Sequence, residues 1–132
     1  MKVEILSELN TIPYRGNKKT PWLVKDCPRE ILLEDFSLMV CGERYSVPKN
    51  YIFDGASIPT ILWFLYSYDY KYSWRASAFH DYCYSHLYKK GVTKSFADKV
   101  FREIMVLDGA RKTTAWLFYW AVRLFGKGGW NK

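Results

Sequence analysis

The residue pattern of this chain changes once, at the segment Asp54–Pro59, and this change constrains the fold more than any other feature. Before it, short apolar or alternating runs are separated by turn-forming residues, which is typical of β-strands. After it, apolar residues recur at the three- and four-residue spacing of amphipathic helices. We therefore expect an α+β fold, with a small N-terminal antiparallel β-sheet packed against a C-terminal subdomain of three or four helices.

The N-terminal part contains four predicted strands separated by turn formers. Phe36–Val40 and Arg44–Val47 flank the turn Cys41-Gly42-Glu43, so we expect these two strands to form a hairpin. The predicted strands are Val3–Leu6, Trp22–Lys25, Phe36–Val40 and Arg44–Val47.

The C-terminal part contains helical patterns with marked ends. Ser73 can cap the second helix, Gly91 should end it, Thr93 or Ser95 should begin the third, and Gly109 should end that one. The predicted helices are approximately Thr60–Leu65, Ser73–Tyr88, Lys94–Leu107 and Thr113–Phe125.

The length of 132 residues is close to the commonest size of one domain. We predict a single domain over residues 1–132, with a β-rich part at 1–53 and a helical part at 54–132. The composition is 49% hydrophobic and 19% aromatic, which is far too rich in bulky side chains for a disordered chain.

The charge balance restricts the expected partners and location. A formal net charge of +7 favours an anionic partner, but the basic residues come in small groups and no nucleic-acid motif is visible. Nucleic acid is therefore not the expected partner. Three cysteines without a CxxC pair argue against a disulfide framework. With no signal-peptide pattern and no long apolar run, we expect a protein of the host cytoplasm or of a virion, without a transmembrane helix.

One stripe of the predicted helix Ser73–Tyr88 carries the polar groups that are chemically suggestive. His80 and Tyr84 lie on this stripe, with Asp81 beside them. The structural interpretation is a half-buried histidine satisfied by one carboxylate. The catalytic interpretation is a general base held by a carboxylate, with an adjacent aspartate that holds a cation. The stripe consists of Ala76, Phe79, His80, Cys83, Tyr84 and Leu87.

The segment His80–Tyr84, followed by Ala97-Asp98, resembles the phospholipases A2, in which a helix carries His-Asp-x-x-Tyr and the next antiparallel helix supplies another aspartate. The resemblance implies that His80 deprotonates a water that attacks a glycerophospholipid ester. It also implies that Asp81 holds Ca²⁺ against the developing oxyanion, and that Tyr84 and Asp98 orient His80. The glycine-rich calcium loop of that family has only Asp54–Ser57 as a counterpart here.

The spacing of the two helices predicts which side chains meet. In a simple hairpin centred near Gly91, Asp98 falls opposite Tyr84 or Ser85, and Glu103 falls nearer to His80. This register places Asp98 against Tyr84 alone, as an alternative to the contact with His80 that the resemblance implies.

A second resemblance covers about Tyr45 to Ala110. The chain is similar to a small family of unknown function found in tailed phages and prophages, which implies a phage origin and no particular activity. The matching segments are Val47-Pro48, Asp54–Pro59, Trp74–Ser77, His80–Tyr82, Ala97-Asp98 and Phe101-Arg102.

Asp54 has two alternative roles. It can cap the turn that leads into the next helix, or it can enter the same pocket as His80. In the second case Asp54, His80, Asp81 and Asp98 would form a cluster of one histidine and three carboxylates, suited to Ca²⁺, Mg²⁺ or a catalytic Zn²⁺.

The C-terminal segment Trp116–Phe125 is aromatic on most of its circumference and is followed by the basic, glycine-rich Gly126–Trp130. This pattern predicts either a core helix with an oligomer contact or a helix that lies at a membrane interface.

Two hypotheses of function follow. One is a phospholipase-A2-like, metal-dependent ester hydrolase that acts at a phospholipid membrane surface. The alternative is a non-enzymatic virion, tail or accessory protein that binds phage structural proteins, in which His80, Asp81 and Asp98 form a buried polar cluster.

Overall fold

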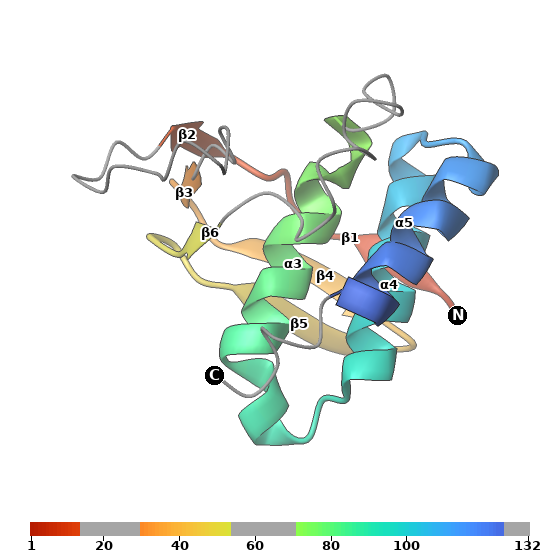
Figure 1. The fold of residues 1–132 in the computed structure, drawn as a ribbon. Helices are drawn as coiled ribbons and strands as arrows, with labels where there is room; N and C mark the ends of the chain where they lie inside the picture. Colours follow the sequence, from red (N-terminus) through yellow and green to blue (C-terminus); the bar gives the residue numbers. More distant parts are fainter. Residues whose placement is uncertain (14–29, 54–70, 126–132) are drawn as a thin grey trace, which may run out of the picture.

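The computed structural model describes residues 1–13, 30–53 and 71–125, and it has the predicted α+β fold (Figure 1). Six short strands occupy the N-terminal part, and three α-helices with two 3-10 turns occupy the described C-terminal part. The elements are β1 (Val3–Ile5), β2 (Thr11–Pro13), β3 (Glu30–Leu32), β4 (Phe36–Val40), β5 (Glu43–Val47), β6 (Ile52–Phe53), η1 (Lys71–Ser73), α3 (Trp74–Ser85), η2 (Leu87–Lys90), α4 (Lys94–Asp108) and α5 (Lys112–Phe125).

The strands form two antiparallel sheets of three strands each, in the orders β1-β4-β5 and β2-β3-β6, where one sheet was predicted. The strands of the second sheet have only two or three residues each, too few to produce a visible alternation. The predicted hairpin is confirmed. Its turn is Cys41-Gly42 alone, and φ is positive at both residues (51° and 84°), the geometry whose twist suits a two-residue hairpin loop.

The core lies between the first sheet and the helices. Phe36, Leu38 and Val40 alternate along β4 and are fully or almost fully buried. Helix α3 contacts β5, α4 contacts β1, and α5 packs on α4, so the helices cover the sheet in the arrangement of Figure 1. The predicted stripe of α3 is confirmed, since all of its six residues are buried.

The helix ends explain how the α3–α4 connection is built. The predicted helix Ser73–Tyr88 ends at Ser85 and is followed by η2, which Gly91 ends with φ of 91°. Ser73 precedes α3, but its side chain makes no capping hydrogen bond. Thr93, and not Ser95, caps α4, because its side chain accepts a hydrogen bond from the Phe96 amide.

The remaining sequence predictions concern α5 and the undescribed segments. Gly109 ends α4 with φ of 114°, and α5 follows almost at once, one residue earlier than predicted. Across the three described stretches, no helix combines the length and the apolar character needed to cross a bilayer. The predicted elements Trp22–Lys25 and Thr60–Leu65 lie outside the described residues.

Candidate functional site

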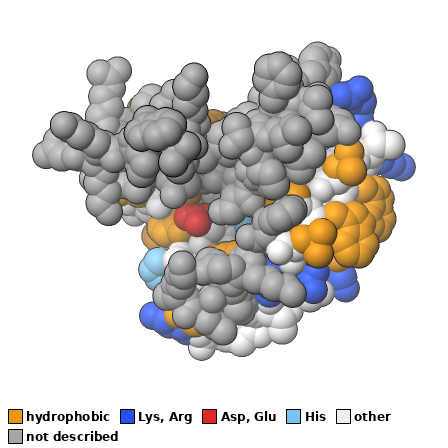
Figure 2. Space-filling view, in the orientation of Figure 1, with side chains coloured by type: hydrophobic (Ala, Val, Ile, Leu, Met, Phe, Trp, Pro, Cys, Tyr) orange, Lys and Arg blue, Asp and Glu red, His pale blue; other side chains and the backbone are white. Residues whose placement is uncertain are grey.

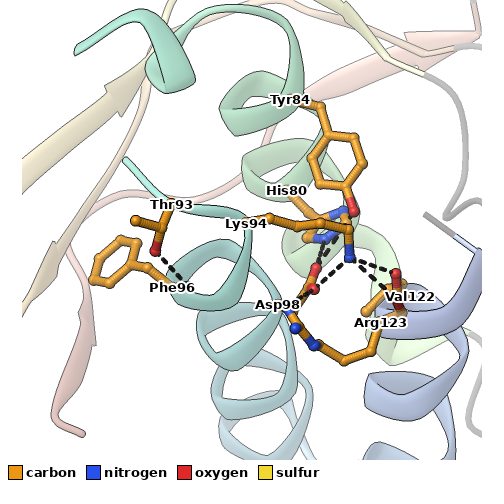
Figure 3. Close-up of polar contacts among 8 residues, drawn as sticks. All are labelled: His80, Tyr84, Thr93, Lys94, Phe96, Asp98, Val122 and Arg123. Atoms are coloured by element: carbon orange, nitrogen blue, oxygen red, sulfur yellow. Dashed lines mark hydrogen bonds and ion pairs between the residues drawn. The ribbon is translucent and has the colours of Figure 1, made fainter. Parts of the chain in front are cut away.

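Neighbouring helices α3 and α4 bring His80 and Asp98 into direct contact. His80 Nε2 lies 2.5 Å from Asp98 Oδ1, and the Tyr84 hydroxyl donates to the same oxygen at 3.4 Å. His80 and Tyr84 are one helical turn apart, so they project from one face of α3. All three side chains are buried, Asp98 completely. Figure 3 shows them converging between the helices.

Asp98 contacts His80, as the phospholipase A2 resemblance implies, and the hairpin register that placed it against Tyr84 alone is wrong. Helix α3 ends early and η2 intervenes, so the two helices do not face each other residue by residue around Gly91. The ring of His80 also leans over that of Tyr84, with their centroids 4.3 Å apart, and one carboxylate oxygen therefore reaches both side chains. Glu103, expected nearer to His80, contacts Arg102 at 3.4 Å.

Two cations bind the other oxygen of Asp98. Lys94 Nζ lies 2.7 Å and Arg123 Nη1 lies 3.0 Å from Asp98 Oδ2. Burial alone would raise the pKa of this carboxyl, but the hydrogen bonds from His80 and Lys94, with the positive charge of Lys94, hold the pKa below its usual range. Asp98 is therefore an ionised, fully hydrogen-bonded carboxylate in the interior.

His80 occupies an apolar setting that disfavours its charged form. The rings of Tyr84 and Phe101 pack against it, the latter at a centroid distance of 5.2 Å. Burial lowers the pKa of His80 below its ordinary value; this effect outweighs the hydrogen bond and the charge of Asp98, which raise the pKa, and the charge of Lys94 adds to the lowering.

A neutral His80 has one protonated ring nitrogen and one lone pair. Contact with the Asp98 carboxylate assigns the proton to Nε2, so the lone pair is on Nδ1. Within the described residues, Nδ1 makes no hydrogen bond. This arrangement is chemically able to accept a proton from a bound water.

Lys94 connects the site to the end of α5. Besides Asp98, its ammonium donates to the backbone carbonyl of Val122 at 2.9 Å and to that of Arg123 at 3.4 Å. Sequence reasoning missed both cations. The four-residue spacing of Lys94 and Asp98 on one helix was a usable signal for the first. Arg123 comes from α5, and no sequence spacing relates it to Asp98.

Asp81 lies apart from this cluster. Its Oδ2 accepts a hydrogen bond from the Tyr51 hydroxyl at 2.7 Å, and the same hydroxyl lies 2.7 Å from Ser85 Oγ. Successive helical residues point about 100° apart, so Asp81 faces Tyr51 while His80 faces α4.

The described residues do not assemble the predicted metal site. Asp54 lies outside them, and in the described parts of the chain no three His, Cys, Asp or Glu side chains are grouped to hold an ion. Asp81 by itself does not make up a calcium site, since Ca²⁺ takes six or more oxygen ligands. Metal binding through Asp81 and Asp54 stays a prediction.

Comparison with known proteins places the chain in a family. A family model described as "Protein of unknown function (DUF1353)" matches residues 31–122, which is more than half of the 132-residue chain. The matched segment includes His80, Tyr84 and Asp98. No curated protein matches the chain, and no solved structure does. The expectation of an uncharacterised domain family is thereby confirmed, and the chain belongs to the DUF1353 family of proteins of unknown function.

Proposed function

We propose that this chain is a phospholipase-A2-like ester hydrolase in which His80 is the general base. The observation that carries the proposal is the orientation of His80. Its Nε2 contacts Asp98 Oδ1 at 2.5 Å, which leaves the Nδ1 lone pair without a hydrogen bond among the described residues. A histidine held in this way, in one tautomer and neutral, meets the requirements of a base that activates water.

In the proposed reaction, His80 Nδ1 takes a proton from water while the water oxygen bonds to the ester carbonyl carbon. The tetrahedral intermediate then breaks its bond to the alkoxy oxygen, and His80 returns the proton to this leaving group. The products are a fatty acid and a lysophospholipid. Water alone is a poor nucleophile, so removal of its proton is the step that the chain must assist.

Asp98 and Tyr84 are positioning residues in this scheme. Asp98 accepts a hydrogen bond from Nε2–H and stabilises the imidazolium that forms transiently. The Tyr84 ring packs on the His80 ring at a tilt and its hydroxyl donates to the same carboxylate oxygen, so Tyr84 restricts both partners. If Asp81 and Asp54 bind Ca²⁺, the ion would supply positive charge for the developing oxyanion.

The test is hydrolysis of mixed phospholipid vesicles by the purified full-length chain, with Ca²⁺ and with EDTA. We expect fatty-acid release that falls roughly a hundredfold or more in His80→Ala, the usual size of a general-base contribution. Tyr45→Phe is the matched control, because it changes a side chain that packs on Phe79 of α3 but removes only a hydroxyl that donates to Glu43. No release from folded wild-type protein would contradict the proposal.

The comparison of Ca²⁺ with EDTA tests the metal requirement separately. Loss of release in EDTA, together with loss in Asp81→Asn, would support Asp81 as a ligand. Equal release in both buffers would remove Asp81 and Asp54 from the proposed site.

A second candidate is a non-enzymatic role in which the same cluster only holds the helices together. One observation favours it: Asp98 binds side chains from α3, α4 and α5 at once. A carboxylate with two cationic partners is also a strong structural link. In that case the chain would act through protein contacts as an accessory or virion component.

We also propose a tailed phage or prophage as the source, with action in the host cytoplasm or in the virion. This part of the proposal depends on the sequence resemblance over about Tyr45 to Ala110. Phospholipid at a membrane surface is the partner under the hydrolase proposal, and phage structural proteins are the partner under the alternative.

A further inference from the structure

The outer face of α5 carries an exposed stripe of large apolar side chains. Trp116 is 48% exposed, Trp120 53% and Leu124 62%, and Leu117 beside them is 40% exposed. The spacing of 116, 120 and 124 places these residues on one side of the helix. The opposite side is buried against α4 through residues such as Phe118 and Val122. Figure 2 shows hydrophobic side chains gathered at the edge of the molecule that α5 occupies in Figure 1.

The aromatic part of this stripe is held in a fixed arrangement. The ring of Trp116 meets that of Tyr119 at 5.7 Å, and Tyr119 meets Trp120 at 5.5 Å, both edge to face. The Arg102 guanidinium of α4 lies 4.3 Å from the centre of the Trp116 ring and 4.8 Å from that of Tyr119. The stripe is therefore ordered before it meets a partner, which reduces the entropy lost on binding.

The charges around the stripe are mostly positive. Helix α5 contains Lys112 and Arg123 and no acidic residue. A surface cavity of about 400 Å³ next to Trp116 is lined by Arg102 and Lys112, with Glu103 and Val106 completing it. Exposed tryptophans beside cations match the boundary between acyl chains and anionic headgroups. We propose that this face of α5 docks on membranes that contain anionic phospholipid.

A second copy of the chain fits this face less well. Each copy carries a formal net charge of +7, and pairing two α5 helices would bring together two Lys112 side chains with no acidic residue on either helix. An anionic lipid surface supplies the missing negative charge. The charges therefore favour lipid over self-association.

The docking face is joined to the candidate site through α5, and this part of the inference rests on the proposed function. Arg123, next to Leu124 at the end of the stripe, binds Asp98, and the carbonyls of Val122 and Arg123 bind Lys94. A membrane held against the stripe would lie near the end of the helix that contacts the His80–Asp98 pair. The substrate is then a phospholipid of a bilayer that contains anionic lipid.

The test is co-sedimentation of the full-length chain with phosphatidylglycerol-containing vesicles and with pure phosphatidylcholine vesicles. We expect binding to the anionic vesicles that weakens as salt is raised. Trp120→Ser should lower the partition coefficient of the protein onto these vesicles roughly tenfold, because the exposed half of the Trp120 side chain no longer contacts the lipid. Leu33→Ser is the matched control, since Leu33 is 44% exposed next to β3, away from α5.

The outcomes separate docking from catalysis. Hydrolysis of a short-chain phosphatidylcholine below its micellar concentration tests His80 without a membrane, and Trp120→Ser should leave that rate unchanged. Vesicle binding with no such hydrolysis would support the docking face and contradict the hydrolase. No binding to anionic vesicles, or equal binding by wild type and Trp120→Ser, would overturn the docking proposal. A dimer in light scattering that Trp120→Ser converts to monomer would overturn it in favour of a second copy.

Discussion

Lys94 lies one helical turn before Asp98 and binds its Oδ2 at 2.7 Å, while His80 occupies Oδ1 of the same carboxylate. The cation and the imidazole therefore do not compete for one oxygen. Lys94 balances the negative charge of Asp98. Asp98 can therefore orient His80 by a hydrogen bond without forcing the imidazole into its charged form. The predictions below test this division.

Replacing Asp98 with asparagine should destabilise the fold strongly. The change keeps the shape of the side chain but leaves Lys94 and Arg123 without their counter-charge, at a cost of about 3 kcal/mol in the free energy of unfolding. Arg123→Gln should cost less than about 1 kcal/mol, because that side chain is a third exposed and Lys94 remains. Urea denaturation measures both. Similar losses in the two variants would show that Asp98 is not the centre of the cluster.

Lys94→Met should loosen the end of α5. The ammonium donates to the carbonyls of Val122 and Arg123, so its removal leaves the last turn of the helix without that anchor. We expect faster amide hydrogen exchange near residues 121–125 and a loss of about 2 kcal/mol in stability. Lys99→Met, at an exposed position of the same helix, should change neither. Unchanged exchange in Lys94→Met would mean that the carbonyl contacts do not hold the helix end.

The stability of the fold should fall as the pH is lowered below about 6.5, the ordinary pKa of histidine. Burial lowers the pKa of His80 in the folded chain, so between that lowered value and 6.5 the unfolded chain binds a proton that the folded chain does not. The stabilisation is complete above 6.5 and is lost progressively as the pH falls toward the folded-state value. His80→Gln should lose this part of the pH dependence. Chemical denaturation between pH 5.5 and 8 checks the sign, and a gain in stability on acidification would contradict the assignment.

The sequence was most informative where a pattern extends over many residues. The 3.6-residue period of Ser73–Tyr88 predicted the buried stripe of α3, and Thr93 and Gly109 mark the two ends of α4, whereas Gly91 ends η2 and not α3. The β2–β3–β6 sheet was missed, because strands of two or three residues carry no period.

The site was predictable in its residue types but not in its contacts. His80, Tyr84 and Asp98 do meet, although hairpin symmetry alone placed Asp98 only against Tyr84. The interruption of α3 at Ser85 and the tilt of the His80 ring decide that contact, and neither is encoded in spacing. Arg123 reaches Asp98 across α5, a tertiary contact with no local signature.

Two glycines at helix ends should differ in their tolerance of alanine. Gly109 and Gly91 both have positive φ. Replacing either with alanine forces a side chain into the left-handed region and should cost about 1 kcal/mol in the free energy of unfolding. At Gly109 an added Cβ would also lie 3.3 Å from the Tyr72 ring, whereas at Gly91 nothing lies within 4 Å. We expect Gly109→Ala to lower the melting temperature more than Gly91→Ala. The reverse order would mean that the Tyr72 contact relaxes freely.

The measurement that tests the central claim most directly is the rate of ester hydrolysis of a short-chain, monomeric phosphatidylcholine by wild type and by His80→Gln, at pH 7 and at equal folded fractions. Tyr45→Phe serves as the control, because it removes a hydroxyl that donates to Glu43. If His80 is the base that Asp98 orients, wild type and Tyr45→Phe release fatty acid, and His80→Gln is slower by roughly a hundredfold or more. Equal rates in folded wild type and His80→Gln, or no hydrolysis by either, would contradict the account and leave the cluster as a structural link between the three helices.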